Sequence, residues 1–167
     1  MYKTYYASPI GQILILTDEN ALLGLWLENQ KYFGAGYDLE QAQQEETKVS
    51  QHVVAWLDAY FKGENPATDE IPLAPQVTEF RSKVLTVLQK IPYGQTATYS
   101  DILRKLQAEY GKIGSARAVG GAIGHNPISI IIPCHRIVGS DGKLTGYAGG
   151  LDKKPFLLEL ESGEKTE

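Results

Sequence analysis

The chain of 167 residues contains a single cysteine, Cys134. One cysteine excludes an intramolecular disulfide and any zinc site built from several thiolates. The three histidines, His52, His125 and His135, do not make a convincing metal site on their own. Stability must therefore come from an apolar core, and a chain of this length that is 43% hydrophobic can build one. We expect neither a metal nor a cofactor.

Composition and charge narrow the class of protein. The longest apolar run, residues 128–133, is far shorter than the roughly 18 residues that span a bilayer, and the N-terminus lacks a secretion signal. We therefore expect a cytoplasmic protein without membrane contact. Residues 1–75 carry 4 basic and 11 acidic side chains, whereas residues 76–167 carry 12 basic and 9 acidic ones. A polyanionic partner would meet the second part.

The first part of the chain predicts a small sheet and a helix. Residues 32–46 are rich in Gln and Glu and predict a loop. Apolar side chains recur every three or four residues over residues 48–62, which indicates an amphipathic helix that ends at Gly63. Strand-like runs rich in Tyr, Ile and Leu lie at residues 3–7, 13–16 and 22–27.

Three prolines and the lack of a long apolar run make residues 64–76 a linker between two lobes. We therefore expect an N-terminal supporting domain at residues 1–75 and a second domain at residues 76–167. The fold class is α+β, with an antiparallel sheet and a helix in the first lobe and a mostly helical second lobe.

The second lobe predicts a series of short helices, at residues 77–90, 99–108 and 116–124. Thr98 and Asp101 form a capping-box-like pair before the second helix, and Ser115 can cap the third. The apolar residues 128–132 predict a buried strand. A last helix is expected after Asp152, with its leucines directed inward, namely Leu157, Leu158 and Leu160.

The two helices at residues 99–108 and 116–124 resemble a helix-turn-helix pair. The second of them contains Gly120 and Gly121 among alanines, although each glycine costs a helix about 1 kcal/mol relative to alanine. Two explanations remain open. Small residues permit tight packing against a neighbouring helix, or they let a nucleic-acid backbone lie against this face.

Cys134 lies in the run Pro133-Cys134-His135-Arg136, directly after the predicted strand. A lone cysteine is commonly a buried, inert side chain, and a lone histidine is as often a buried structural one. A nucleophilic thiolate requires a nearby base or cation. His135 and Arg136 adjoin Cys134, and Glu161 lies on the last helix, so a Cys–His–Glu relay is the functional hypothesis.

Several motifs together resemble the O6-alkylguanine-DNA alkyltransferase family. They cover residues 78–161 closely, whereas the first lobe agrees in length and β-rich character. The motifs are Pro92-Tyr93-Gly94 with Thr98-Tyr99, Ala116-Arg117-Ala118-Val119-Gly120-Gly121-Ala122, Asn126-Pro127, Pro133-Cys134-His135-Arg136 and Gly146-Tyr147-Ala148-Gly149-Gly150.

The resemblance implies direct repair of O6-alkylguanine, chiefly O6-methylguanine, in double-stranded DNA. The damaged nucleotide is flipped out of the duplex, and its alkyl group moves irreversibly to Cys134. His135 would be the base acting through water, Glu161 its orienting carboxylate and Asn126 the hinge between recognition helix and active site. Each molecule, expected to be a monomer, reacts once and needs no cofactor.

The resemblance also implies a DNA surface and a substrate pocket. Arg117 would fill the space left by the flipped base, and Tyr99 would press on the 3′ phosphate. Ala116 and Gly120 would lie against the DNA on the helix of small residues, which suits entry into the minor groove. The residues that would line the alkyl pocket are Val138, Tyr147 and Ala148.

Two alternatives differ in chemistry from single-turnover repair. A hydrolase with a Cys–His–Glu relay would release product repeatedly. A non-catalytic module would bind alkylated DNA without reacting. The chain departs from some relatives at Ala148, where a hydroxyl residue is found, so a backbone amide would contact guanine O6. It also lacks the cysteines through which some relatives bind zinc.

Overall fold

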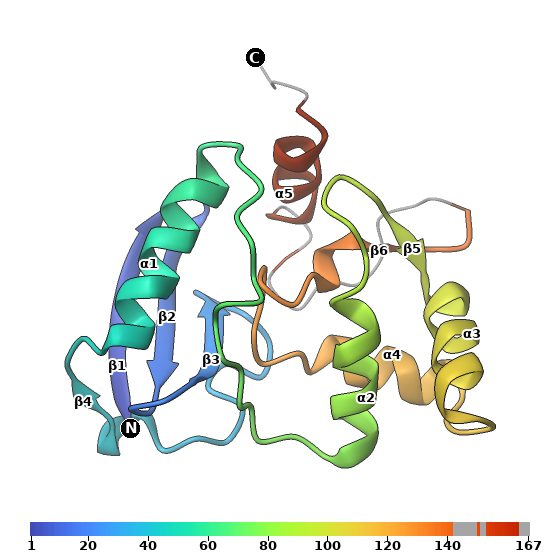
Figure 1. Ribbon diagram of the computed structural model, residues 1–167, viewed down its shortest axis with the longest axis horizontal. Helices are drawn as coiled ribbons and strands as arrows, with labels where there is room; N and C mark the ends of the chain where they lie inside the picture. The colour runs from blue at the N-terminus through green and yellow to red at the C-terminus, as the bar shows by residue number, and fades with distance from the viewer. Residues whose placement is uncertain (142–149, 151–152, 164–167) are drawn as a thin grey trace. The chain divides into compact units, whose positions relative to one another are not determined.

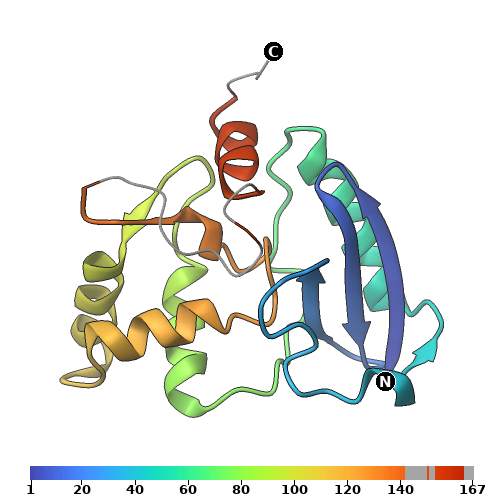
Figure 2. The same cartoon turned by 180° about the vertical axis from the view of Figure 1, so that it is seen from behind.

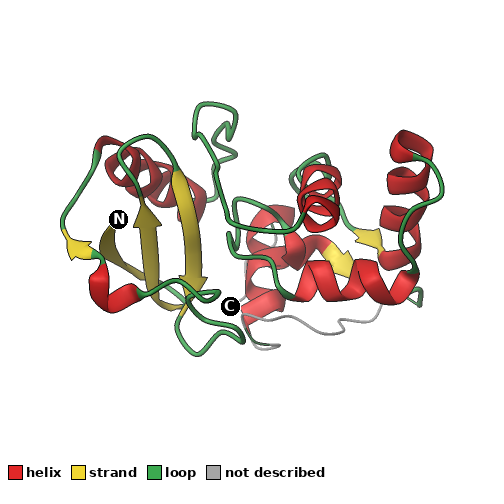
Figure 3. Cartoon of the chain, turned by 90° about the horizontal axis from the view of Figure 1, so that it is seen from below, coloured by secondary structure: helices red, strands yellow, loops and turns green. Residues whose placement is uncertain are grey.

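A computed structural model describes residues 1–141, 150 and 153–163. The chain divides into two compact units. The first comprises Met1–Gln76 and Pro127–Ser129, and the second comprises Val77–Asn126 and the chain from Ile130 onward. The long strands belong to the first unit and most helices to the second (Figure 3). The expected α+β fold, with an antiparallel-dominated N-terminal sheet, is confirmed.

The sheet of the first unit is built on a hairpin of β1 (Tyr2–Ser8) and β2 (Gly11–Thr17) (Figure 1). The turn needs glycine at position 11, where φ is +108°, and Ser8 Oγ closes it by donating to the Gly11 carbonyl at 2.6 Å. β3 (Leu22–Leu27) pairs antiparallel with β2, which gives the strand order β3-β2-β1-β4.

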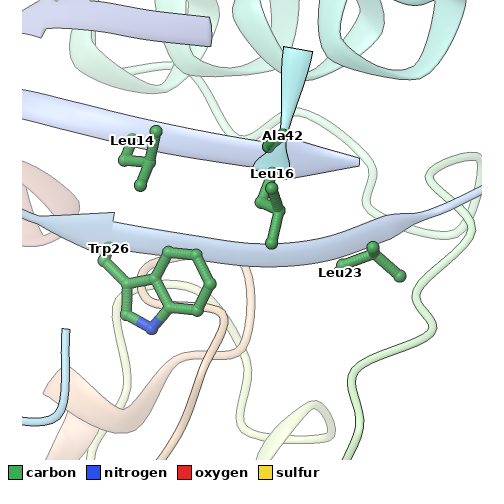
Figure 4. Close-up of a cluster of buried hydrophobic side chains, with 5 residues drawn as sticks. All are labelled: Leu14, Leu16, Leu23, Trp26 and Ala42. Atoms are coloured by element: carbon green, nitrogen blue, oxygen red, sulfur yellow. The ribbon is translucent and has the colours of Figure 1, made fainter. Parts of the chain in front are cut away.

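β2 is apolar on both faces, because Ile13 and Ile15 alternate with Leu14 and Leu16 and all four are buried. The helix α1 (Lys48–Phe61) packs against β1 and β2. Five buried side chains form a hydrophobic cluster in the first unit (Figure 4), namely Leu14, Leu16, Leu23, Trp26 and Ala42. The first unit therefore carries its own core.

The prediction of a plain loop over residues 32–46 is wrong in part. The segment contains a short 3₁₀ turn, η1 (Leu39–Gln41), and a strand, β4 (Gln43–Gln44), which pairs parallel with the start of β1. Both residues of β4 are exposed glutamines at a sheet edge. Backbone pairing alone makes this strand, so no hydrophobic pattern marks it.

The prediction of a strand over residues 128–132 is also wrong. Only Ile128 makes a bridge, to Leu25, and the chain then turns. Ile130 has a φ of +70°, a conformation that breaks an extended strand and that a β-branched residue rarely adopts. The isoleucines of this segment are nevertheless buried, so their hydrophobicity predicts burial correctly.

Three helices of the second unit, α2 (Glu79–Leu88), α3 (Tyr99–Tyr110) and α4 (Ala116–Gly124), pack on one another (Figure 2). The predicted caps are confirmed. Asp101 N donates to Thr98 Oγ1 at 3.1 Å, and Thr98 N donates to Asp101 Oδ2 at 2.9 Å. Ser115 Oγ accepts from Ala118 N at 3.1 Å.

The remaining elements of the second unit lie around Cys134. A 3₁₀ turn, η2 (Cys134–Arg136), leads into β6 (Ile137–Val138), which pairs parallel with β5 (Ala97–Thr98). The last helix, α5 (Lys153–Ser162), packs against η2. Its predicted cap, Asp152, lies outside the described residues. No helix in the described part of the chain is both long and apolar enough to cross a membrane.

The predicted inward face of α5 is wrong for two of its three leucines. Leu157 is fully buried, but Leu158 and Leu160 are only half-buried. The buried stripe of this helix consists of Lys154, Leu157 and Glu161, which recur at spacings of three and four residues. Two charged side chains, Lys154 and Glu161, thus share the buried face that the prediction assigned to the leucines.

Candidate active site

The backbone before Cys134 makes a tight turn. Pro133 has φ −84° and ψ 63°, the geometry of an inverse γ-turn, and Cys134 N donates to the Ile132 carbonyl at 2.8 Å. Proline suits this position because its ring restricts φ to nearly this value. The following 3₁₀ turn buries three consecutive side chains, those of Cys134, His135 and Arg136.

Asn126 links the end of α4 to this turn. Its side chain is 2% exposed, and its Nδ2 donates to the same Ile132 carbonyl at 2.9 Å. The Asn126 amide also hydrogen-bonds the Cys134 thiol. The helix that carries Arg117 is therefore connected through one amide to the cysteine.

The Cys134 thiol is protonated at neutral pH. Burial raises its pKa to about 11. The Asn126 hydrogen bond, the Lys154 charge and the backbone N–H groups of Cys134 and His135 act in the opposite direction. The free protein thus holds a neutral thiol in surroundings that include donors and a cation able to stabilise a thiolate.

His135 and Glu161 form a buried pair, although 26 residues separate them in the sequence. His135 Nε2 lies 2.5 Å from Glu161 Oε2, and both side chains are almost completely buried. Burial lowers the pKa of His135, while Glu161 opposes the shift, so the imidazole is neutral at pH 7. A carboxylate only accepts, so Nε2 carries the proton and Nδ1 is the basic nitrogen.

Arg136 also contacts Glu161, whereas the sequence motif indicates only a cation next to Cys134. Its Nε donates to Glu161 Oε1 at 2.7 Å, and its Nη2 donates to Oε2 at 3.1 Å. The structure therefore pairs this cation with the acid of the relay. The sequence motif contains Arg136 but does not reveal its partner, which lies 25 residues further along.

Lys154 is a second charged residue near Cys134 that no sequence motif predicts. It lies in the first turn of α5 and is fully buried. Burial lowers its pKa, and Cys134 opposes this shift. The only sequence signal is its place three residues before Leu157 and seven before Glu161, which is the spacing of one helix face.

The predicted DNA contacts lie at the starts of two helices. Tyr99 is the first residue of α3 and is half-buried, whereas Ala116 and Arg117 are exposed in the first turn of α4. Apart from the backbone of α4 itself, a Cβ on Gly120 or Gly121 meets no atom within 4 Å in the described part of the chain. Tight packing against a neighbouring helix therefore does not explain these glycines.

The predicted substrate pocket is only partly described. Val138 ends β6 and is 8% exposed. Tyr147 and Ala148 lie outside the described residues. Among the residues that the structure describes, no group of three or more His, Cys, Asp and Glu side chains could hold a metal ion.

Two family models match almost the whole chain. Residues 1–75 match the ribonuclease-like domain of 6-O-methylguanine DNA methyltransferase, and residues 79–163 match its DNA binding domain. A methylated-DNA–protein-cysteine methyltransferase of Haemophilus influenzae is 42% identical over 161 residues, which cover 96% of this chain and 86% of that protein. One from Methanosarcina acetivorans is 41% identical over 96% of this chain and 98% of its own length.

A crystal structure of Mycobacterium tuberculosis OGT in complex with DNA has the same fold. Its TM-score is 0.83 at 37% identity, and the match covers 98% of this chain and 94% of that chain. Three observations indicate the same family. They are the motifs around Cys134, the buried His135–Glu161 pair and the two family models. The chain therefore belongs to the 6-O-methylguanine DNA methyltransferase family.

Proposed function

We propose that this protein repairs O6-alkylguanine, chiefly O6-methylguanine, in double-stranded DNA by transferring the alkyl group irreversibly to Cys134. The observation that carries this proposal is a buried cysteine that directly precedes a histidine, whose imidazole lies 2.5 Å from a buried carboxylate. The family relation supports the same reaction. The protein acts as a monomer, and we expect it in the cytoplasm.

The transfer begins with removal of the thiol proton. The proton leaves Cys134 Sγ through a water molecule to His135 Nδ1, and Glu161 stabilises the resulting imidazolium. The thiolate attacks the alkyl carbon, so an S–C bond forms while the C–O6 bond breaks. The electron pair goes to guanine O6, and the guanine takes up one proton from solvent while the His135 imidazolium returns its proton to solvent. Cys134 is left as a thioether, which has no simple route back.

Lys154 and Asn126 favour the thiolate at the moment of transfer. Before DNA binds, burial keeps the thiol neutral, and its raised pKa protects it from unspecific reaction. Once the proton has left, the buried Lys154 charge and the Asn126 amide stabilise the anion in a medium where charge interactions are strong.

The second domain, residues 76–167, binds the duplex, while residues 1–75 support it. The small residues of α4, including the exposed Ala116 and the half-buried Gly120, enter the minor groove, and Arg117 takes the place of the flipped base. Tyr99 contacts the 3′ phosphate. The alkyl group enters a pocket made by Val138, Tyr147 and Ala148.

Intact-mass spectrometry distinguishes this function from its alternatives. After incubation with a duplex containing O6-methylguanine, each molecule should gain about 14 Da, one methylene unit, on Cys134 and then stop reacting. Cys134→Ser is the matched control that gains no mass. Repeated product release would indicate a hydrolase, and binding without any mass gain would indicate a non-catalytic module.

Gly120→Ala tests whether the small face of α4 serves DNA rather than folding. The Cβ meets no atom within 4 Å, so alanine should stabilise the helix by up to about 1 kcal/mol. The same methyl group should obstruct the minor groove and slow repair of duplex DNA roughly tenfold. Thermal unfolding and single-turnover repair measure the two effects. A variant that is less stable, or that repairs duplex normally, contradicts this role.

A further inference from the structure

We propose that Arg136 is a positioning residue that holds Glu161 as a carboxylate and thereby fixes which nitrogen of His135 carries the proton. The inference rests on the proposed function, in which His135 is the base. Arg136 acts through its contact with Glu161 and through its charge, and it does not touch the reacting atoms.

Three nitrogens of the Arg136 guanidinium each donate a hydrogen bond. Nε and Nη2 donate to the two oxygens of Glu161, at 2.7 and 3.1 Å, and Nη1 donates to the Ile91 carbonyl at 2.7 Å. The ring of Tyr93 lies 5.8 Å from the guanidinium carbon, within the range of a cation–π contact. This forked geometry is specific to arginine, because a lysine ammonium does not match both carboxylate oxygens.

The arrangement determines the protonation state of the carboxyl group. An isolated carboxylate at this depth would be too costly and would take up a proton. Two guanidinium N–H groups, together with Gly94 N at 3.3 Å from Oε1, satisfy the charged form instead. Glu161 thus remains an acceptor, and its contact with His135 Nε2 requires the proton of the imidazole to lie on Nε2.

The tautomer of His135 decides whether it can act. With the proton on Nε2, Nδ1 is free of a proton and can accept the one from Cys134. A protonated Glu161 would donate to Nε2, which would place the imidazole proton on Nδ1. The nitrogen required as the base would then be blocked.

Arg136 also affects the charge of His135. Among the residues that the structure describes, the charged groups that act on the imidazole are Glu161 and Lys154 of α5 and Arg136 of η2. Burial lowers the pKa of His135, Glu161 raises it, and the positive charges of Arg136 and Lys154 lower it again by smaller amounts. Removing Arg136 leaves the Glu161–His135 pair without its main counter-charge, so the pair takes up a proton at a higher pH. Whether that proton lies on Glu161 or on the imidazole, Nδ1 is protonated and His135 no longer acts as a base.

Three variants of the full chain test the role of Arg136, with soluble O6-benzylguanine as substrate. In wild type, ¹⁵N NMR of the imidazole should show the proton on Nε2 at pH 7. In Arg136→Met, the acid limb of the pH–rate profile should shift to higher pH by about one unit. At a pH below the pKa of His135, the rate should therefore fall roughly tenfold relative to wild type. Arg136→Lys, which keeps the charge, should lie between the two. Arg104→Met, an exposed arginine paired with Asp101, should match wild type.

The outcomes separate this inference from the proposed function. Failure of the wild type to gain about 14 Da from a duplex containing O6-methylguanine would refute the function, while the NMR measurement would still test the tautomer. An active wild type with the proton on Nδ1, or superimposable pH profiles for Arg136→Met and wild type, would overturn the role of Arg136. If Arg136→Met does not fold, the wild-type tautomer and the profile of Arg136→Lys decide the question.

Discussion

Arg117→Ala should slow repair of O6-methylguanine in duplex DNA about 100-fold and change the reaction with free O6-benzylguanine less than about twofold. Flipping a nucleotide out of the stack costs a few kcal/mol, and a side chain inserted in its place offsets part of that cost. Arg117 is exposed in the first turn of α4, next to Ala116 and Ala118, so no neighbouring bulky residue on this helix can substitute for it. A free base needs no flipping.

The control for this prediction is Arg104→Ala. Arg104 is exposed on α3 and pairs with Asp101, so its removal lowers the positive charge of the second unit by the same amount. Single-turnover rates on both substrates, measured at two salt concentrations, separate the loss of a charge from the loss of an inserted side chain. Equal losses on duplex and free base would make Arg117 a structural residue.

Local rules predict most elements of this fold correctly. The capping pair of Thr98 and Asp101 and the cap at Ser115 specify the starts of α3 and α4, because their hydrogen bonds span only three residues. The hairpin and α1 likewise follow from short-range periodicity. Such interactions depend on residues that are close in the sequence, and they can therefore be predicted without a structure.

The errors arise where distant residues determine the backbone. β4 exists because residues 43 and 44 meet the start of β1, about forty positions away, and exposed glutamines give no pattern that predicts this. The segment 128–132 has the hydrophobicity of a strand, but Ile130 adopts a φ of +70°. Tertiary context maintains that unfavourable conformation, and propensity predicts the opposite.

Some features of the candidate site can likewise be predicted from the sequence, whereas others depend on tertiary packing. The residues alone predict a relay of Cys134, His135 and Glu161, and the family resemblance implies the role of each. The guanidinium–carboxylate pair of Arg136 and the burial of Lys154 depend on how α5 packs against η2. Lys153 is only half-buried while its neighbour Lys154 is fully buried, a difference that composition does not predict. Lys154 and Glu161 therefore occupy buried positions of α5 that a regular amphipathic pattern would give to apolar side chains.

Glu161→Gln should lower the rate of alkyl transfer from O6-benzylguanine at pH 7 by about 100-fold, a typical effect of losing general-base assistance. Wild type should vary little with pH above the lowered pKa of His135, because the neutral imidazole removes the thiol proton. Without this assistance only the ionised fraction of Cys134 reacts. Since burial raises the pKa of that thiol to about 11, the fraction is roughly one in 10⁴ at pH 7.

The deficit of Glu161→Gln should therefore shrink as the pH rises, because the thiolate fraction grows about tenfold per pH unit below the pKa of Cys134. A raised pKa also means that the folded protein loses stability as the pH rises above the ordinary thiol value of about 8.5. Thermal unfolding at each pH should therefore define the usable range. Glu159→Gln, the same substitution two residues away on α5, should follow wild type. Superimposable profiles for Glu161→Gln and wild type would exclude Glu161 from proton transfer and leave His135 without a carboxylate partner in the reaction.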